Sequence, residues 1–161
     1  MTGVDLVRRL AELEQRVAAL EGDERETVVL SDGDDGGGEL GYGGQVSLGG
    51  GRVSWRIDVT PERALSLADR PRIEVLAALA HPARVDIVRS LLAGGPQPAT
   101  ALQEAARLGS TGQLYHHLKA LTGSGVVEQD KRGSYRLRSA ATVPVLVLLT
   151  AAADVAGQLR A

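Results

Sequence analysis

The chain has 161 residues, 2% aromatic content and no cysteine, which fits one aliphatic core with extensions and excludes sensing through thiolates. Its net charge of −2 is unevenly distributed: residues 1–71 carry 8 basic and 14 acidic side chains (net −6), and residues 72–140 carry 9 and 5 (net +4). A basic half beside an acidic half is the distribution expected when only one part of a protein meets phosphate groups.

Residues 1–26 have the pattern of a coiled-coil dimerisation helix. Five apolar residues recur at spacings of 4, 3, 4 and 3, which makes a heptad seam: Leu6, Leu10, Leu13, Val17 and Leu20. Arginines at the g positions and glutamates at the following e positions would pair across a parallel dimer. Since so short a coil is marginal alone, a helix folded back on its own subunit is the alternative. We expect the coiled coil to form between two subunits.

Residues 27–38 are rich in glycine and aspartate and predict a flexible linker. Gly36, Gly38 and Gly41 fit the spacing G-x-G-x-x-G, but no strand leads into it and no helix opens after it. A nucleotide site is therefore not expected here. No cofactor is predicted for any part of the chain.

Residues 39–71 predict a β-hairpin followed by a short helix. Apolar residues alternate on both sides of a glycine turn at 49–51, namely Leu40, Tyr42, Val46 and Leu48, then Val53, Trp55, Ile57 and Val59. Thr60, Pro61 and Glu62 suit a helix start. Because a two-stranded hairpin is barely stable alone, it must pack on something. We prefer a packing or dimerisation extension; a docking site for a partner protein or small ligand is the alternative.

Residues 72–140 contain two short helices joined by a tight turn. Thr100 with Gln103 predicts a capping box for the first helix, whose apolar side is Leu102, Ala105 and Ala106. The turn is predicted at 107–109, ending in Gly109. Ser110 with Gln113 predicts a second capping box. This order is that of a helix-turn-helix.

The second helix has two different faces. Leu114, Leu118 and Leu121 recur at i, i+4 and i+7 and form an apolar stripe. The opposite face carries small, polar or cationic residues suited to a DNA major groove, namely Gly112, Tyr115, His116 and Lys119.

A basic hairpin is predicted after this helix. Gly123 and Gly125 end the helix, and a strand beginning at 126–127 can pair with Tyr135 and Leu137. The intervening loop 130–134 would then be a wing. Its Lys131 and Arg132 suit phosphate or minor-groove contacts, although such a tip is often only solvated surface.

Two stretches of this domain carry a family pattern. Residues 79–91 read LAHPARVDIVRSL, and residues 114–121 read LYHHLKAL. Residues 72–138 thereby resemble the ArsR-type winged helix-turn-helix regulators. The resemblance implies a dimeric DNA-binding regulator, usually a repressor released by a signal, in which His117 faces inward.

The resemblance also assigns the DNA-binding residues. In the recognition helix they are Ser110, Thr111, Gln113, Tyr115, His116 and Lys119, and in the wing they are Lys131, Arg132 and Ser134. No metal site is expected, because the chain has only three histidines and the neighbours His116 and His117 point about 100° apart on a helix.

Residues 141–161 predict a C-terminal apolar helix. The run from Val143 to about Gly157 is interrupted by Pro144 and falls short of the roughly 20 residues that a bilayer span needs. We expect it to pack on the core or to join the dimer interface, where Leu146 and Leu149 would contribute.

The predicted fold is α+β and mainly α: a winged helix-turn-helix domain with an N-terminal coiled-coil helix and a β-hairpin extension. The predicted function is a sequence-specific DNA-binding transcriptional regulator, a homodimeric repressor at a palindromic operator in double-stranded DNA. The alternative is a winged-helix module that binds proteins without binding DNA. No catalytic nucleophile with an obvious base is left over, so no enzyme is expected. The charged N-terminus predicts no signal peptide and a cytoplasmic, nucleoid-associated protein that does not bind membranes.

Overall fold

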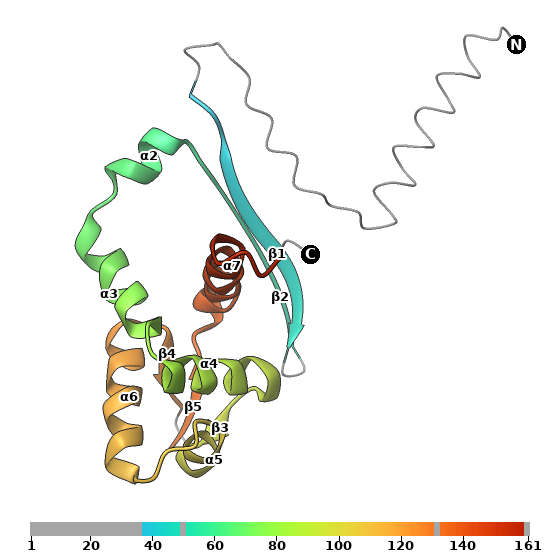
Figure 1. The fold of residues 1–161 in the computed structure, drawn as a ribbon. Helices are drawn as coiled ribbons and strands as arrows, with labels where there is room; N and C mark the ends of the chain where they lie inside the picture. The colour runs from blue at the N-terminus through green and yellow to red at the C-terminus, as the bar shows by residue number, and fades with distance from the viewer. Residues whose placement is uncertain (1–36, 49–50, 131–132, 160–161) are drawn as a thin grey trace, which may run out of the picture. The chain divides into compact units, whose positions relative to one another are not determined.

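The computed structural model describes residues 37–48, 51–130 and 133–159. The described elements, in chain order, are β1 (Leu40–Leu48), β2 (Gly51–Val59), α2 (Pro61–Ser66), α3 (Asp69–Leu79), α4 (Pro82–Gly94), β3 (Gln97–Pro98), α5 (Ala99–Ala105), α6 (Thr111–Gly123), β4 (Val127–Gln129), β5 (Ser134–Leu137) and α7 (Ser139–Val155) (Figure 1). The mixture of helices and short strands confirms the α+β prediction. The predicted coiled coil, with Leu6, Leu10, Leu13, Val17 and Leu20, lies outside the described residues.

The predicted hairpin is present, with β1 and β2 antiparallel and in register from Leu40 opposite Val59 to Leu48 opposite Gly51. Along β2 the alternation is strict, because every second side chain from Val53 to Val59 is half-buried and those between are exposed. On β1 a Cβ at Gly43 would lie 2.6 Å from the carbonyl oxygen of Trp55. Glycine is therefore required for the two strands to approach closely at this point.

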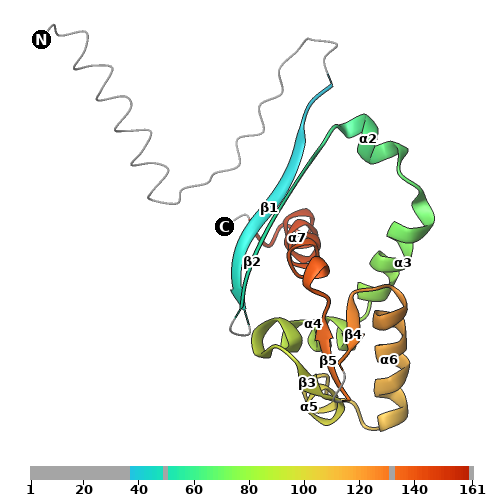
Figure 2. The same ribbon diagram turned by 180° about the vertical axis from the view of Figure 1, so that it is seen from behind.

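Helix α7 lies beside the hairpin in both views and contacts both of its strands (Figures 1 and 2). At Gly44 of β1, an added Cβ would be 3.8 Å from the Cγ1 of Val143 on α7. This packing meets the requirement that a two-stranded sheet needs a further layer. The hairpin is therefore an extension built on α7.

The helices α4, α5 and α6 enclose the core together with the small sheet, whose strand order is β3-β5-β4. The largest fully buried side chains are aliphatic: Ile87, Val88, Leu102, Leu114, Leu118, Leu121, Val126 and Val127. Tyr135 of β5 is the aromatic member of this cluster. The core is thus aliphatic, as the composition predicts.

The start of α5 differs from the sequence prediction. Thr100 is not a cap, because α5 begins one residue earlier, at Ala99, and its N-cap is Pro98, which has no side-chain hydrogen bond to offer. Pro98 and Gln97 pair with Ser134 and Tyr135 of β5, so the chain enters the helix directly from a strand. Ala105, predicted on the apolar side, is exposed. Sheet pairing therefore overrides the capping signal here.

The turn after α5 also differs in detail. Arg107, rather than Gly109, takes the left-handed conformation, with φ 53°. The N–H of Leu108 donates to the carbonyl of Gln103 and that of Arg107 to Glu104, which is the Schellman pattern of helix ends. The Gln103 side chain adds a hydrogen bond to the Leu108 carbonyl, at 3.2 Å. These bonds offset the strain of a non-glycine residue in this conformation.

The C-terminal helix α7 is longer than the apolar run alone indicated, since it begins at Ser139 and contains Pro144. Leu146 and Leu149, predicted at a dimer interface, are half-buried against the core of their own subunit. Val155, near the end of the helix, is 89% exposed. Among the described residues, no helix is both long and apolar enough to cross a bilayer.

Truncation of the core should be costly. Leu121→Ala should lower the free energy of unfolding by about 2–5 kcal/mol, because this side chain is completely buried. The same change at Leu159, which is 57% exposed, is the matched control and should cost under about 0.5 kcal/mol. Urea denaturation followed by circular dichroism measures both. Equal losses at the two positions would contradict this description of the core.

Candidate nucleic-acid interface

Helix α6 starts at the predicted cap. The Oγ of Ser110 accepts a hydrogen bond from the N–H of Gln113 at 3.3 Å, which satisfies one of the free donors of the first turn. The reciprocal bond from the Gln113 side chain is not found among the hydrogen bonds of the described residues. Half of the predicted capping box is therefore present, and it sets the residue at which α6 begins.

The apolar stripe of α6 determines which of its faces is free. Leu114, Leu118 and Leu121 are at most 2% exposed and pack into the core. The residues predicted to contact DNA lie on the remaining surface, and all are exposed: Thr111, Gln113, Tyr115, His116 and Lys119. A Cβ at Gly112 would meet nothing within 4 Å. The outer face of α6 is therefore open, polar and cationic.

His117 faces inward, as the family resemblance implies. His117 is 8% exposed and is one of the buried polar residues. Burial lowers the pKa of His117 from its ordinary value of 6.5, and the positive charges of His81, Arg84 and His116 lower it further. The neutral form of this imidazole is therefore favoured behind the exposed face of α6.

The predicted wing is a hairpin of β4 and β5. Val127 is paired with Leu137 and Gln129 with Tyr135. The turn is closed by the Gly133 N–H, which donates to the Asp130 carbonyl at 3.1 Å. Gly133 has φ 73°, in the region that favours glycine. Lys131 and Arg132 lie outside the described residues, between these two ends of the turn.

Ser134, the remaining predicted wing residue, is partly buried. It stands opposite Pro98 of β3, and its Oγ lies 3.5 Å from the Oδ2 of Asp130. Ser134 is therefore tied into the base of the wing and projects less than the residues of α6.

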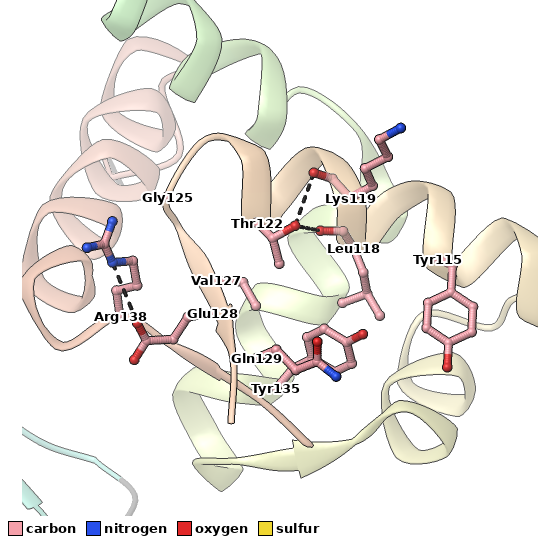
Figure 3. A pocket seen from close by; sticks show the side chains of 10 residues that line it. All are labelled: Tyr115, Leu118, Lys119, Thr122, Gly125, Val127, Glu128, Gln129, Tyr135 and Arg138. Carbon is pink, nitrogen blue, oxygen red and sulfur yellow. Dashed lines mark hydrogen bonds and ion pairs between the residues drawn. The ribbon is translucent and has the colours of Figure 1, made fainter. Parts of the chain in front are cut away.

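A groove of about 480 Å³ separates α6 from the wing strands (Figure 3). Tyr115 and Lys119 line it from α6, and Gln129, Tyr135 and Arg138 line it from the wing side. Sequence reasoning missed the wing-side residues as members of the surface. Strand alternation could not have found them, because the consecutive residues Glu128 and Gln129 both line the groove, as does Arg138 beyond the end of β5.

The electrostatics of this groove are set by arginine pairs and a buried phenol. Glu128 is held by Arg136 at 2.7 Å and lies 3.7 Å from Arg138, so its carboxylate is neutralised from two sides. Burial, followed by the influence of Tyr115, raises the pKa of Tyr135 above its ordinary value, and its phenol stays protonated. The groove can thus offer cationic groups and a hydroxyl donor to an anion.

Comparison with known proteins agrees with this geometry. The family model described as a helix-turn-helix domain matches residues 79–130, from the end of α3 to the first residue of the wing turn. No curated protein and no solved structure matches the chain. The match covers both helices of the predicted pair, and it supports a DNA-binding domain of the helix-turn-helix class.

The Ser110 cap has a testable effect on stability. Ser110→Ala removes the acceptor for the Gln113 N–H and should lower the free energy of unfolding by about 1 kcal/mol. Ser110→Asn keeps an acceptor at the same position and should stay within a few tenths of a kcal/mol of the wild type. Thermal or urea unfolding measures both variants. If the two substitutions had the same effect, the cap would not be what stabilises this end of α6.

Proposed function

We propose that the protein is a sequence-specific transcriptional regulator, a homodimeric repressor of the ArsR type that binds a palindromic operator. The observation that carries the proposal is the open outer face of α6, with Gly112, Tyr115, His116 and Lys119, directed away from a core that buries the opposite stripe. A helix with such a face can enter a major groove, where side chains distinguish base pairs. A regulator of this kind would act on chromosomal DNA in the cytoplasm.

The wing side of the groove supports backbone contacts in this proposal. Arg136 lies on β5, the strand that leads away from the wing turn, and Arg138 directly follows the end of this strand. Lys131 and Arg132 are at the tip of the wing in the sequence. Phosphate contacts of this kind fix the orientation of a protein on DNA, while the recognition helix supplies specificity. The proposed division of roles therefore assigns phosphates to the wing and base edges to α6.

The dimer is supported by apolar surface that the single chain leaves uncovered. Ile73 and Leu76 on α3 are 57% and 52% exposed, and Leu65 and Leu67 nearby in sequence are exposed as well. Exposed apolar residues gathered in one segment are typical of an interface. A second subunit bound there, with the coil of residues 1–26, would carry two recognition helices at half-sites about 34–36 Å apart.

The same exposed leucines favour a second candidate, a winged-helix module that binds proteins without DNA. The two candidates differ in salt dependence, because neutralising phosphates releases counterions and makes affinity fall steeply as salt rises. The experiment incubates the purified full chain with fragmented genomic DNA at two salt concentrations and sequences the retained fragments. Enrichment of a palindromic site supports the regulator, and no enrichment by a folded dimer supports the protein-binding module.

Lys119 should contribute affinity for every DNA sequence. Lys119→Ala should weaken specific and nonspecific binding alike and should reduce the slope of log affinity against log salt by about 1, because one phosphate contact is lost. Arg52→Ala, which removes an exposed cation from β2 of the hairpin, is the matched control and should leave the slope unchanged. Fluorescence anisotropy titrations over a salt series measure both. Identical slopes for the two variants would count against the assignment of Lys119.

Gln113 and His116 should contribute base preference instead. Gln113→Ala or His116→Ala should lower the preference for the operator over a variant with one base pair changed, by about 1–3 kcal/mol at the affected position. Competition binding with a set of singly substituted operators measures this. A uniform loss across all operators would assign these two residues to the backbone and not to bases.

A further inference from the structure

All three histidines of the chain meet where the turn between α3 and α4 packs on α6. The rings of His81 and His117 have centroids 4.5 Å apart and are tilted by 40°. The rings of His116 and His117 are 5.6 Å apart and nearly perpendicular. Arg84, one turn into α4, completes this group, which we call the histidine joint. Imidazoles are thus concentrated where the packed side of α6 meets its exposed face.

His81 has a structural task that requires its neutral form. Its Nδ1 accepts a hydrogen bond from the Ala83 N–H at 3.2 Å and so caps α4. An imidazolium has a proton on both nitrogens and offers no lone pair, so a proton on Nδ1 removes the cap. A cation at this position also opposes the positive end of the α4 dipole. Protonation of His81 therefore loosens the start of α4.

The surroundings of His117 also favour a neutral imidazole. Its Nδ1 is buried and has no hydrogen-bond partner in the described part of the chain, and the same holds for the Nε of Arg84. The groups that act on His117 are His81, Arg84 and His116, and each disfavours a positive charge there. The Nη2 of Arg84 donates to the Ala77 carbonyl at 3.0 Å, which ties this cation to the end of α3.

The acidic side chains on the other elements packed against α6 are engaged elsewhere or exposed. On α3, Asp69 is bonded to Arg72, and Glu74 pairs with Arg70. Asp86 of α4 pairs with Arg107 at 3.4 Å. Glu128 of β4 pairs with Arg136 and lies near Arg138, and Glu104 of α5 is exposed. Among the described residues, the charged neighbours that act on His117 are therefore cationic.

We propose that the histidine joint is a proton-sensitive latch, in which acidification loosens α4 from α6 and thereby weakens DNA binding. The latch itself rests on the contacts above, and its effect on DNA rests on the proposed function. Above pH 6.5 the buried imidazole of His117 is neutral, and its packing on the ring of His81 is in place. As the pH falls below 6.5, His117 of the unfolded chain binds a proton that the folded chain resists, so stability is lost.

The test is unfolding of the full chain by urea between pH 8 and pH 5.5, where histidines titrate and carboxylates remain charged. The folding constant of the wild type should fall by up to about tenfold per pH unit for each linked proton below pH 6.5. His81→Asn retains a capping acceptor that does not titrate, and it should reduce this dependence. His117→Leu should reduce it further. The exposed Arg52→Ala, which lies outside the joint, is the control and should preserve the pH dependence.

Three results would overturn the latch. One is a wild-type folding constant that does not change between pH 8 and pH 5.5, and another is an unchanged pH dependence in both His81→Asn and His117→Leu. If His117→Leu fails to fold, the pH dependence of unfolding in the wild type and in His81→Asn still tests the latch. The third is operator affinity, measured on folded protein, that is constant or rises on acidification. Absence of DNA binding at every pH would refute the proposed function. The latch would then be tested by the unfolding data only.

Discussion

The burial of one leucine stripe, Leu114, Leu118 and Leu121, is the constraint on which the rest of this domain depends. Because these side chains fill the core, the rotation of α6 about its axis is determined, and its polar face must point outward. The Ser110 cap fixes where the helix begins along that axis. Rotation and start together decide which residues can meet a nucleic acid. The stabilising contacts and the proposed recognition surface therefore lie on opposite faces of one helix.

Helix α7 connects the remaining parts to this core. Val143 and Val145 are buried, while the same helix contacts both strands of the β1–β2 hairpin. The wing strand β5 ends at Leu137, and α7 starts at Ser139, so the wing leads almost directly into α7. The hairpin is linked to the wing through its packing on this same helix. A change in how α7 packs would thus act on both the wing and the hairpin.

The elements that sequence reasoning placed correctly are those whose signals are local. The leucine stripe, the Ser110 cap and the alternation of the hairpin each depend on residues a few positions apart, and all three are present. The false cap at Thr100 fails because Gln97 and Pro98 pair with a strand nearly forty residues later in the chain, which no local pattern reveals. The wing side of the groove was missed for the same reason. His81 and His117, 36 residues apart in sequence, likewise come together only through tertiary packing.

His116 and His117 show how closely the two roles of α6 adjoin. One residue step rotates a side chain by about 100°, which takes the first imidazole to the exposed face and the second into the packing against α4. His116 is exposed, so substitutions there should leave the fold intact while they alter the base preference that we propose for this helix. A substitution at His117 would also alter the surroundings of His81 and Arg84, which act on this buried side chain. The boundary of the proposed recognition surface therefore runs between these two neighbours, and at this boundary a change in the packing of the core could affect the exposed face of α6.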